Sequence, residues 1–346
     1  MLKKEPVRKK EYHIGLDIGT RLIKCAEALS DGNTKKLTKF KFVEIELPFK
    51  QENIAASLKG LLESFQPATK EVNISLSAPS AIVRFINMPK MKKEDLDNSL
   101  RFEAEKYIPF NINEVFIAAS ILEDSAEEKN QMRVLLAAAK KDMVNSRIEM
   151  LKQAGLSVAV IDIDSFACFN AFCDSFGLSA DSGPSRGVPS EAGGAESKDN
   201  NLDQSKSTAI LNIGYNQTNI IISRGKQPFF TRDMQIGGKD IAGAISKGLG
   251  TEEREADKLI FDPKDKGPQV YEIAKTVLNN LVDETRLSFG YYENQFGRAV
   301  DQIYVSGGVA RLSGILGYFE ESFGIKPLTW NPFSKFEIDP KLDAKS

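Results

Sequence analysis

A short polar motif between two apolar runs occurs twice in this chain of 346 residues. The first copy is Asp17-Ile18-Gly19-Thr20, and the second is Asn212-Ile213-Gly214-Tyr215. Each copy ends one run with strand character and is followed by a polar turn and another such run. Because the whole pattern is repeated far along the chain, the sequence predicts two related lobes rather than one continuous core.

The remaining pattern is that of an α/β protein. Before the second copy, strands are predicted at 14–18, 24–29, 40–47, 72–77 and 158–163, with helices at 54–65, 142–154 and 165–176. A compact strand–helix–strand–strand unit, whose helix spans 94–107, interrupts this series. The stretch 177–207 is rich in Ser, Gly and Asp and nearly lacks large apolar residues, which predicts a disordered surface loop.

Charge and composition exclude several classes of function. Lys and Arg total 46 against 48 Asp and Glu, so the chain has no broad basic field for nucleic acid. We expect neither a secretory signal nor a membrane span, because no sufficiently long apolar run is present. Three cysteines without metal-ligand spacing and the single His13 argue against a zinc site and a histidine-dependent triad, and fit a reducing cytoplasm.

Four glycine-containing elements are candidates for binding phosphate or a nucleoside. The two repeated turns can bring backbone N–H groups close to an anion, and Asp17 could hold a metal-bound water. Gly237-Gly238 and Gly307-Gly308 each precede a helical pattern, where the helix N-terminus favours negative charge. Taken singly, each element is weak evidence for a ligand and is better explained as an ordinary tight turn.

In this order, however, the four elements resemble the actin, Hsp70 and sugar-kinase superfamily. The segments that carry the resemblance are IGLDIGTRLIK, ILNIGYNQTNIII and IYVSGGVARLSGI. Within the superfamily the chain is similar to the PilM family of type IV pilus assembly proteins. That likeness rests on LRFEAEKYIPF at 100–110, FTRDMQIGG at 230–238, DETRLSFGYYENQFG at 283–297 and SGGVARLSGILGYFEESFGI at 306–325.

The resemblance implies an actin-like two-lobed fold made of duplicated ribonuclease-H-like domains with an inserted, SHS2-like 1C subdomain. Its implied parts are a first lobe (1A) at 12–80 and 145–176, the 1C subdomain at 81–144, a second lobe (2A) at 208–236 and 298–335, and a 2B subdomain at 237–297. It also implies bound ATP with Mg²⁺. The implied nucleotide contacts are Asp17 (also the metal-binding residue), Gly19, Thr20, Lys24, Asn212, Gly214, Thr218, Gly237, Gly238, Asp257, Gly307, Gly308 and Arg311.

Departures from the superfamily pattern bear on hydrolysis. Asn212 stands where the superfamily has an aspartate that helps to hold the metal and the hydrolytic water, and an amide cannot supply that charge. Ala256, Asp257 and Ile260 replace a common Ala-Glu-x-x-Lys pattern, and Arg21 stands where small hydroxyl residues are usual. We therefore expect nucleotide binding with slow or no hydrolysis, and a scaffold rather than an enzyme.

The same resemblance implies recruitment by a partner. The expected partner is the cytoplasmic tail of a PilN-like inner-membrane protein, which would place the chain in the cytoplasm, peripheral to that membrane and without inserting into it. Other pilus platform and motor proteins and self-association are further candidates. The expected contacts are Arg84, Glu103, Tyr107 and Pro109. The helix at 94–107 could equally use its apolar face to pack on its own sheet, with Tyr107 in that core.

Three other functions remain open at this stage. A phosphotransferase would need a carboxylate base, for which Asp162 and Asp164 are candidates, although Asp164 also fits a helix N-cap. A division protein resembling FtsA would need an amphipathic C-terminal helix, whereas the tail KFEIDPKLDAKS is interrupted by Pro340. A GspL-like secretion protein would continue into a membrane span.

Overall fold

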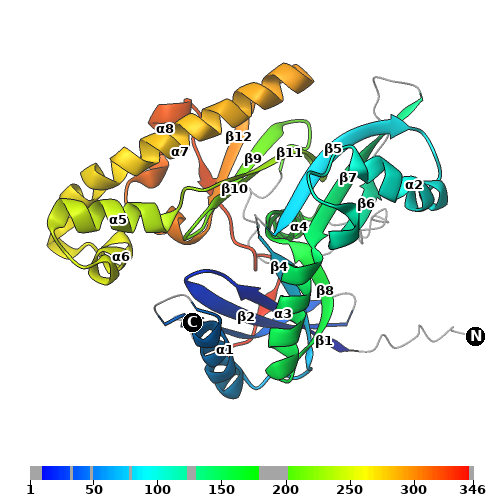
Figure 1. Ribbon diagram of the computed structural model, residues 1–346. Coiled ribbons are helices and arrows are strands. Elements are labelled where there is room, and N and C mark those ends of the chain that lie inside the picture. The colour runs from blue at the N-terminus through cyan, green and yellow to red at the C-terminus, as the bar shows by residue number, and fades with distance from the viewer. Residues whose placement is uncertain are drawn as a thin grey trace, which may run out of the picture. The chain divides into compact units, whose positions relative to one another are not determined.

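The structure is a computed structural model that describes residues 10–31, 34–46, 50–77, 80–122, 130–178 and 202–342. The chain forms two compact units (Figure 1). Unit 1 comprises Met1–Ala167 and Phe333–Ser346, and unit 2 comprises Cys168–Pro332.

Unit 1 is built on a six-stranded sheet with the strand order β14-β3-β2-β1-β4-β8. Its strands are β1 (Glu11–Ile18), β2 (Leu22–Ser30), β3 (Lys35–Glu44), β4 (Glu71–Leu76), β8 (Ser157–Ile163) and β14 (Glu337–Ile338). The first three strands are antiparallel neighbours, whereas β4 and β8 run parallel to β1. Residues of α1 (Gln51–Phe65) and α3 (Lys141–Gln153), such as Leu58 and Leu151, share one core with alternate residues of β1 and β2, such as Ile14 and Ile23.

The segment between β4 and α3 forms a small subdomain of its own. It contains β5 (Ala81–Pro89), α2 (Lys93–Glu105), a 3-10 turn η1 (Ile112–Glu114), β6 (Val115–Ile121) and β7 (Gln131–Lys140). The strands form an antiparallel sheet in the order β5-β7-β6. Leu96, Leu100 and Ala104 of α2 are buried on alternate residues of β7, so the apolar stripe of the helix packs on its own sheet.

Unit 2 repeats the topology of unit 1. Its sheet has the order β11-β10-β9-β12-β13, with the same sequence of antiparallel and parallel neighbours as β3-β2-β1-β4-β8. The strands are β9 (Ser207–Ile213), β10 (Thr218–Arg224), β11 (Gln227–Met234), β12 (Gln302–Ser306) and β13 (Leu328–Thr329). The duplication predicted from the repeated motif is therefore confirmed.

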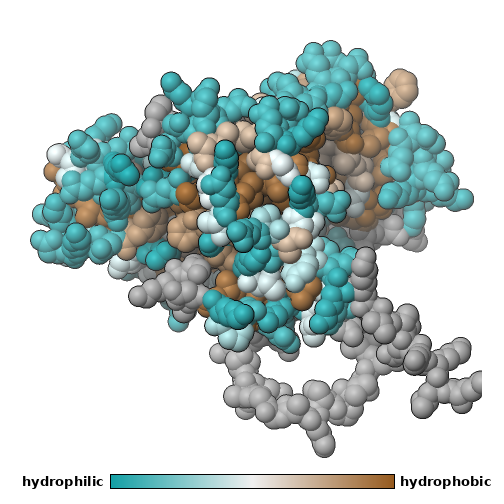
Figure 2. All heavy atoms as spheres, turned by 90° about the horizontal axis from the view of Figure 1, so that it is seen from below, coloured by the Kyte–Doolittle hydropathy of each residue, from teal (hydrophilic) through white to brown (hydrophobic). Residues whose placement is uncertain are grey.

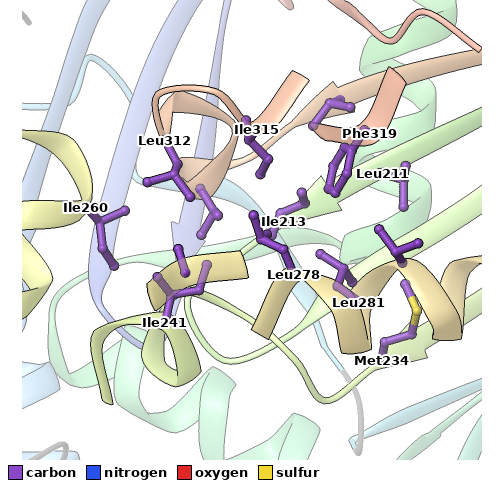
Figure 3. Close-up of a cluster of buried hydrophobic side chains, with 14 of the residues drawn as sticks. Leu211, Ile213, Met234, Ile241, Ile260, Leu278, Leu281, Leu312, Ile315 and Phe319 are labelled. Atoms are coloured by element: carbon purple, nitrogen blue, oxygen red, sulfur yellow. The ribbon is translucent and has the colours of Figure 1, made fainter. Parts of the chain in front are cut away.

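Between β11 and β12 the chain forms the helices of unit 2. They are α5 (Gly238–Leu249), α6 (Glu253–Phe261), the short 3-10 helix η2 (Lys264–Lys266) and the long α7 (Gly267–Phe296). Two further elements follow β12, the 3-10 helix η3 (Gly308–Arg311) and the helix α8 (Ile315–Phe323). Figure 3 shows side chains from these helices and from Leu312 gathered around Ile213 at the end of β9. The end of this strand is therefore anchored in the main core of the unit.

The limits of the two units differ from the lobe boundaries expected at 176 and 335. α4 (Asp164–Ser175) runs across the first limit, because Phe172 is fully buried against Tyr304 and Trp330 of unit 2, with ring centroids 5.0 and 5.3 Å apart. The chain re-enters unit 1 at Phe333, which packs edge-to-face on Phe40, and β14 then pairs with β3. Most of the loop expected at 177–207, namely residues 179–201, lies outside the described residues.

The distribution of hydrophilic and apolar side chains on the surface can be followed in one view of the chain. Hydrophilic side chains cover much of the face seen in Figure 2, and apolar ones gather between them. Among the helices of the described ranges, none has both the length and the apolar character needed to cross a bilayer.

Candidate nucleotide site and partner surface

The first of the two repeated turns, a candidate phosphate site and hereafter the first phosphate turn, joins β1 to β2 in unit 1. The Gly19 N–H donates to the Leu22 carbonyl at 3.0 Å, which closes a tight turn. Asp17 is paired with Lys24 across the two strands, and the Lys24 Nζ lies 2.8 Å from the Asp17 Oδ2 with both side chains about half exposed. Thr20 at the tip of the turn is exposed. The turn thus presents a carboxylate, an ammonium group and a hydroxyl at one end of the sheet.

A cavity of about 490 Å³ lies beside this turn on the sheet of unit 1. Its lining includes Asp17, Lys24 and Asp162. The Asp162 Oδ1 accepts the Ile163 N–H, and the Asp164 Oδ1 accepts the Ser165 N–H, both at 2.7 Å. Asp164 therefore stands at the beginning of α4 and bonds the backbone of the residue that follows it.

The second repeated turn, the other candidate phosphate site, joins β9 to β10 in unit 2 and is closed by an equivalent backbone bond. The Gly214 N–H donates to the Gln217 carbonyl at 2.9 Å. The carbonyls of Gly214 and Tyr215 accept the N–H groups of Gly238 and Lys239, at 3.0 and 2.8 Å, so this turn is bonded to the start of α5. Thr218 is fully buried, and its hydroxyl donates to the Ile236 carbonyl at 2.8 Å. Two of the N–H groups at the start of α5 are therefore engaged by the chain itself.

Asn212 belongs to a chain of side-chain hydrogen bonds at the end of β9. Its Nδ2 donates to the Asn219 Oδ1 at 3.3 Å, and the Asn219 Nδ2 donates to the Asp233 Oδ1. Burial raises the pKa of the Asp233 carboxyl, and the bond from Asn219 opposes this shift. Asn219 and Asp233 were not predicted from the sequence, because only the pairing of β10 with both neighbouring strands brings them beside Asn212.

The glycine pairs of unit 2 meet the same turn at very short range. A Cβ on Gly237 would lie 2.5 Å from the Tyr215 carbonyl oxygen, and one on Gly307 would lie 2.3 Å from that of Ile213. Gly307 also has a φ of 90°, in the left-handed region. Three chain segments therefore converge at the carboxyl ends of the parallel strands β9 and β12, which is where ligands bind in open α/β sheets.

The expected nucleoside contacts lie next to this convergence. A Cβ on Gly308 would approach the exposed ring of Phe261, at 4.0 Å from its Cζ, and the Arg311 guanidinium lies 5.8 Å from the same ring centre. Asp257, by contrast, is buried within α6. Phe261 was not identified from the sequence, because an apolar residue ending a helical pattern carries no signal that separates it from a core residue.

The donor set in unit 1 is compatible with a nucleotide-bound Mg²⁺. Such an ion uses one or two protein carboxylates together with phosphate oxygens and waters, and it does not require a cage of protein ligands. Exposed Asp17 supplies one carboxylate, for which the Lys24 ammonium group competes. Within the described ranges no group of three or more His, Cys, Asp or Glu side chains is placed to hold a metal alone.

The expected partner contacts lie in the small subdomain of unit 1. Tyr107 follows the end of α2 and is 38% exposed, so it is not a core residue, whereas its neighbour Ile108 is buried. Pro109 and Arg84 are exposed, and the Arg84 Nη1 donates to the carbonyl of its own neighbour Val83. Glu103 is paired with Lys106 at 2.9 Å.

Comparisons with known proteins place this arrangement in a family. The model of the family described as type IV pilus assembly protein PilM matches residues 15–183 and 195–346. A solved chain of a PilM-PilN type IV pilus biogenesis complex is similar with 24% identity and a TM-score of 0.79, over 96% of this chain and 92% of that one. The ethanolamine utilization protein EutJ from Carboxydothermus hydrogenoformans is similar in fold, with 10% identity and a TM-score of 0.51, over 94% of this chain and 87% of that one. The chain therefore has the actin-like fold and belongs to the type IV pilus assembly protein PilM family.

Proposed function

We propose that this chain is a nucleotide-binding scaffold of type IV pilus assembly that works in the cytoplasm. In this proposal it reaches the inner membrane by binding the cytoplasmic tail of a PilN-like membrane protein. The observation that carries the proposal is the family match across both units, together with the likeness to a solved chain from a PilM-PilN complex. Contacts with other platform and motor proteins, and self-association, would follow from the same scaffold role.

The small subdomain offers a suitable surface for an extended peptide. In the described residues β5 pairs with β7 and forms an edge of its sheet, so one row of its backbone groups is available to a further strand. Tyr107 offers an exposed aromatic ring, and aromatic residues often dominate the binding energy of an interface. The exposed Arg84 on β5 can add a charged hydrogen bond to such a peptide.

Nucleotide binding is supported by the two phosphate turns with their flanking glycines. Each turn is closed by the same backbone bond, from Gly19 to Leu22 and from Gly214 to Gln217. Asp17 would accept a hydrogen bond from a water of a bound Mg²⁺, and Lys24 and Thr20 would contact phosphate oxygens. Arg311 and Phe261 would hold the base beside Gly308, since arginine and aromatic faces both stack on planar rings.

Slow turnover follows from the environment of Asn212. An amide at this position cannot attract a metal ion or orient a hydrolytic water as a carboxylate does. Its side chain is also engaged in a hydrogen bond to the neighbouring Asn219. We expect turnover of ATP well below about 1 per second, the lower end of ordinary kinase rates.

Co-purification tests the partner half of this proposal. The intact chain is co-expressed with the PilN-like membrane protein of its own genome, either full-length or lacking only its cytoplasmic tail. We expect the chain to co-purify from detergent with the full-length protein and not with the shortened one. Equal recovery with both proteins would contradict recruitment through the tail.

Thermal unfolding and phosphate release test the nucleotide half. A ligand that binds only the folded chain stabilises it by about 2.7 kcal/mol at a hundredfold excess over its Kd. ATP with Mg²⁺ should therefore raise the melting temperature, and phosphate should be released slowly. The absence of any thermal shift would refute nucleotide binding, and turnover faster than about 1 per second would refute the non-enzymatic role.

A further inference from the structure

Arg147 occupies an unusual position on α3. Val144 and Leu151, three residues before it and four after it, are 6% and 0% exposed, so Arg147 lies on the stripe of the helix that faces the sheet. Leu151 belongs to the core that includes Leu16 and Ile74. Arginine is rarely placed among such residues unless its charge is paired.

The guanidinium group of Arg147 is only partly satisfied by the chain. Its Nη1 atom is buried and has no hydrogen-bond partner among the described residues. Burial lowers the pKa of Arg147, and the negative charge of nearby Asp17 opposes that shift. Arginine stays protonated in proteins, so one nitrogen of a charged group is buried here without the acceptor that normally offsets its loss of water.

The course of α3 explains how Arg147 comes close to the first phosphate turn. Just before the helix begins, the Lys140 N–H donates to the Ser80 carbonyl, and the Ser80 N–H donates to the Ser77 carbonyl just after β4 ends. Just after the helix ends, the Ser157 N–H donates to the Lys70 carbonyl, just before β4 begins. The helix therefore runs antiparallel to β4 and to its parallel neighbour β1, and its N-terminal half lies at the end of the sheet that carries Asp17 and Gly19.

We propose that Arg147 is a phosphate-binding residue of the nucleotide site. A guanidinium group forms two parallel hydrogen bonds to a phosphate, and a phosphate at the first turn would supply the acceptors that Arg147 lacks. Arg147 and Lys24 would together place two positive charges near the single carboxylate of Asp17. This charge balance would favour binding of a phosphate chain over binding of a metal ion alone. This inference rests on the proposed nucleotide binding and adds a ligand that none of the glycine motifs contains.

The position of Arg147 also ties the phosphate site to the partner surface. α3 begins at Lys141, directly after β7 ends at Lys140, and β7 is the central strand of the small subdomain. A phosphate bound by Arg147 would therefore hold α3 in place. This helix directly follows the sheet β5-β7-β6, whose strand β5 carries Arg84. The nucleotide would in this way stabilise the junction between the subdomain and the main sheet of unit 1.

Calorimetric titration with ATP, ADP and adenosine tests the assignment, using the full chain and its variants. Arg147→Met keeps the apolar packing between Val144 and Leu151 and removes the charge, whereas Lys152→Met removes a charge from the exposed face of the same helix. We expect Arg147→Met to weaken ATP binding about tenfold to a hundredfold, the value of a charged hydrogen bond, and to change adenosine affinity less than about twofold. Lys152→Met should leave all three affinities unchanged.

A second readout separates a phosphate ligand from a residue that only supports the fold. Because a buried nitrogen of its charged group lacks an acceptor, replacing Arg147 by Met should not lower the melting temperature of the chain without nucleotide. If that variant does not fold, Arg147→Lys retains the charge but forms fewer bonds, and it should weaken ATP more than adenosine. Unchanged ATP affinity, or an equal loss for ATP and adenosine, would overturn the assignment. A wild-type chain that binds no ATP would instead refute the proposed nucleotide function itself.

Discussion

Gly307 leaves no room for a side chain at the end of β12. Its φ of 90° and the 2.3 Å that would separate a Cβ from the Ile213 oxygen make Gly307→Ala strained both in its backbone and in its packing. We expect this change to destabilise unit 2 by about 2 kcal/mol or more, measured by urea denaturation. Gly317→Ala is the matched control, because Gly317 is inside α8 with open space around it and alanine favours helix there. Equal stability of the two variants would contradict the steric strain expected at Gly307.

Asp233 should make the stability of unit 2 depend on pH in the acid range. Burial raises its folded-state pKa, so the folded chain keeps a proton that the unfolded chain releases near its ordinary value of about 3.9. The stabilisation from this group is complete below that value and is lost as pH rises through the raised folded-state pKa.

Asp233→Asn tests this sign, because asparagine is neutral throughout and can still accept from Asn219. We expect the stability of the variant relative to the wild type to rise between about pH 4 and pH 7, as followed by denaturation. A constant difference over this range would contradict the assignment.

At the residue scale the sequence points to candidate residues with a local pattern and misses those whose surroundings come from distant parts of the chain. Gly19, Gly214 and Gly307 were identifiable, because each stands in a glycine-containing pattern that directly follows an apolar run. Arg147 and Asp233 were not identifiable, because their environment comes from strands and helices that are distant in sequence. For Tyr107 the sequence allows either a core or a surface position, because its burial depends on where α2 ends.

At the scale of elements, most helices and strands follow from apolar periodicity. The helix expected at 94–107 is α2 at Lys93–Glu105, and the strands beside the repeated motif lie close to where they were expected. The sequence did not reveal that α4 spans both units. Its apolar residues fit either lobe equally well, and only the contacts of Phe172 with Tyr304 and Trp330 assign the end of this helix to unit 2.

Phe172→Ala tests this assignment of α4. The ring is fully buried in an aromatic cluster, so its loss should destabilise the chain by about 3–5 kcal/mol. Phe102→Ala is a suitable control, because Phe102 on α2 is 77% exposed and its removal should change stability by less than about 0.5 kcal/mol. Calorimetric scans should show the Phe172 effect in the transition of unit 2, and a loss confined to unit 1 would be evidence against the assignment.

At the scale of the whole molecule, the duplicated topology and the inserted subdomain are what the repeated motif and the family resemblance implied. The strand order of the second sheet could be inferred once the first was known, because the two halves share one pattern of connections. The occupants of the site could not be inferred in the same way. Glycines required for close packing and glycines required by a ligand look identical in a sequence.

Peptide titration is the most direct test of the central claim, that this scaffold is recruited by a PilN-like tail. The intact chain, Tyr107→Ala and Phe102→Ala are each titrated with the cytoplasmic tail of the PilN-like protein from the same genome. We predict saturable one-to-one binding by the wild type, retained within about twofold by Phe102→Ala and weakened at least about tenfold by Tyr107→Ala, with an unchanged melting temperature in each variant. A wild-type chain that ignores the peptide, or a loss caused by Phe102→Ala and not by Tyr107→Ala, would contradict the account.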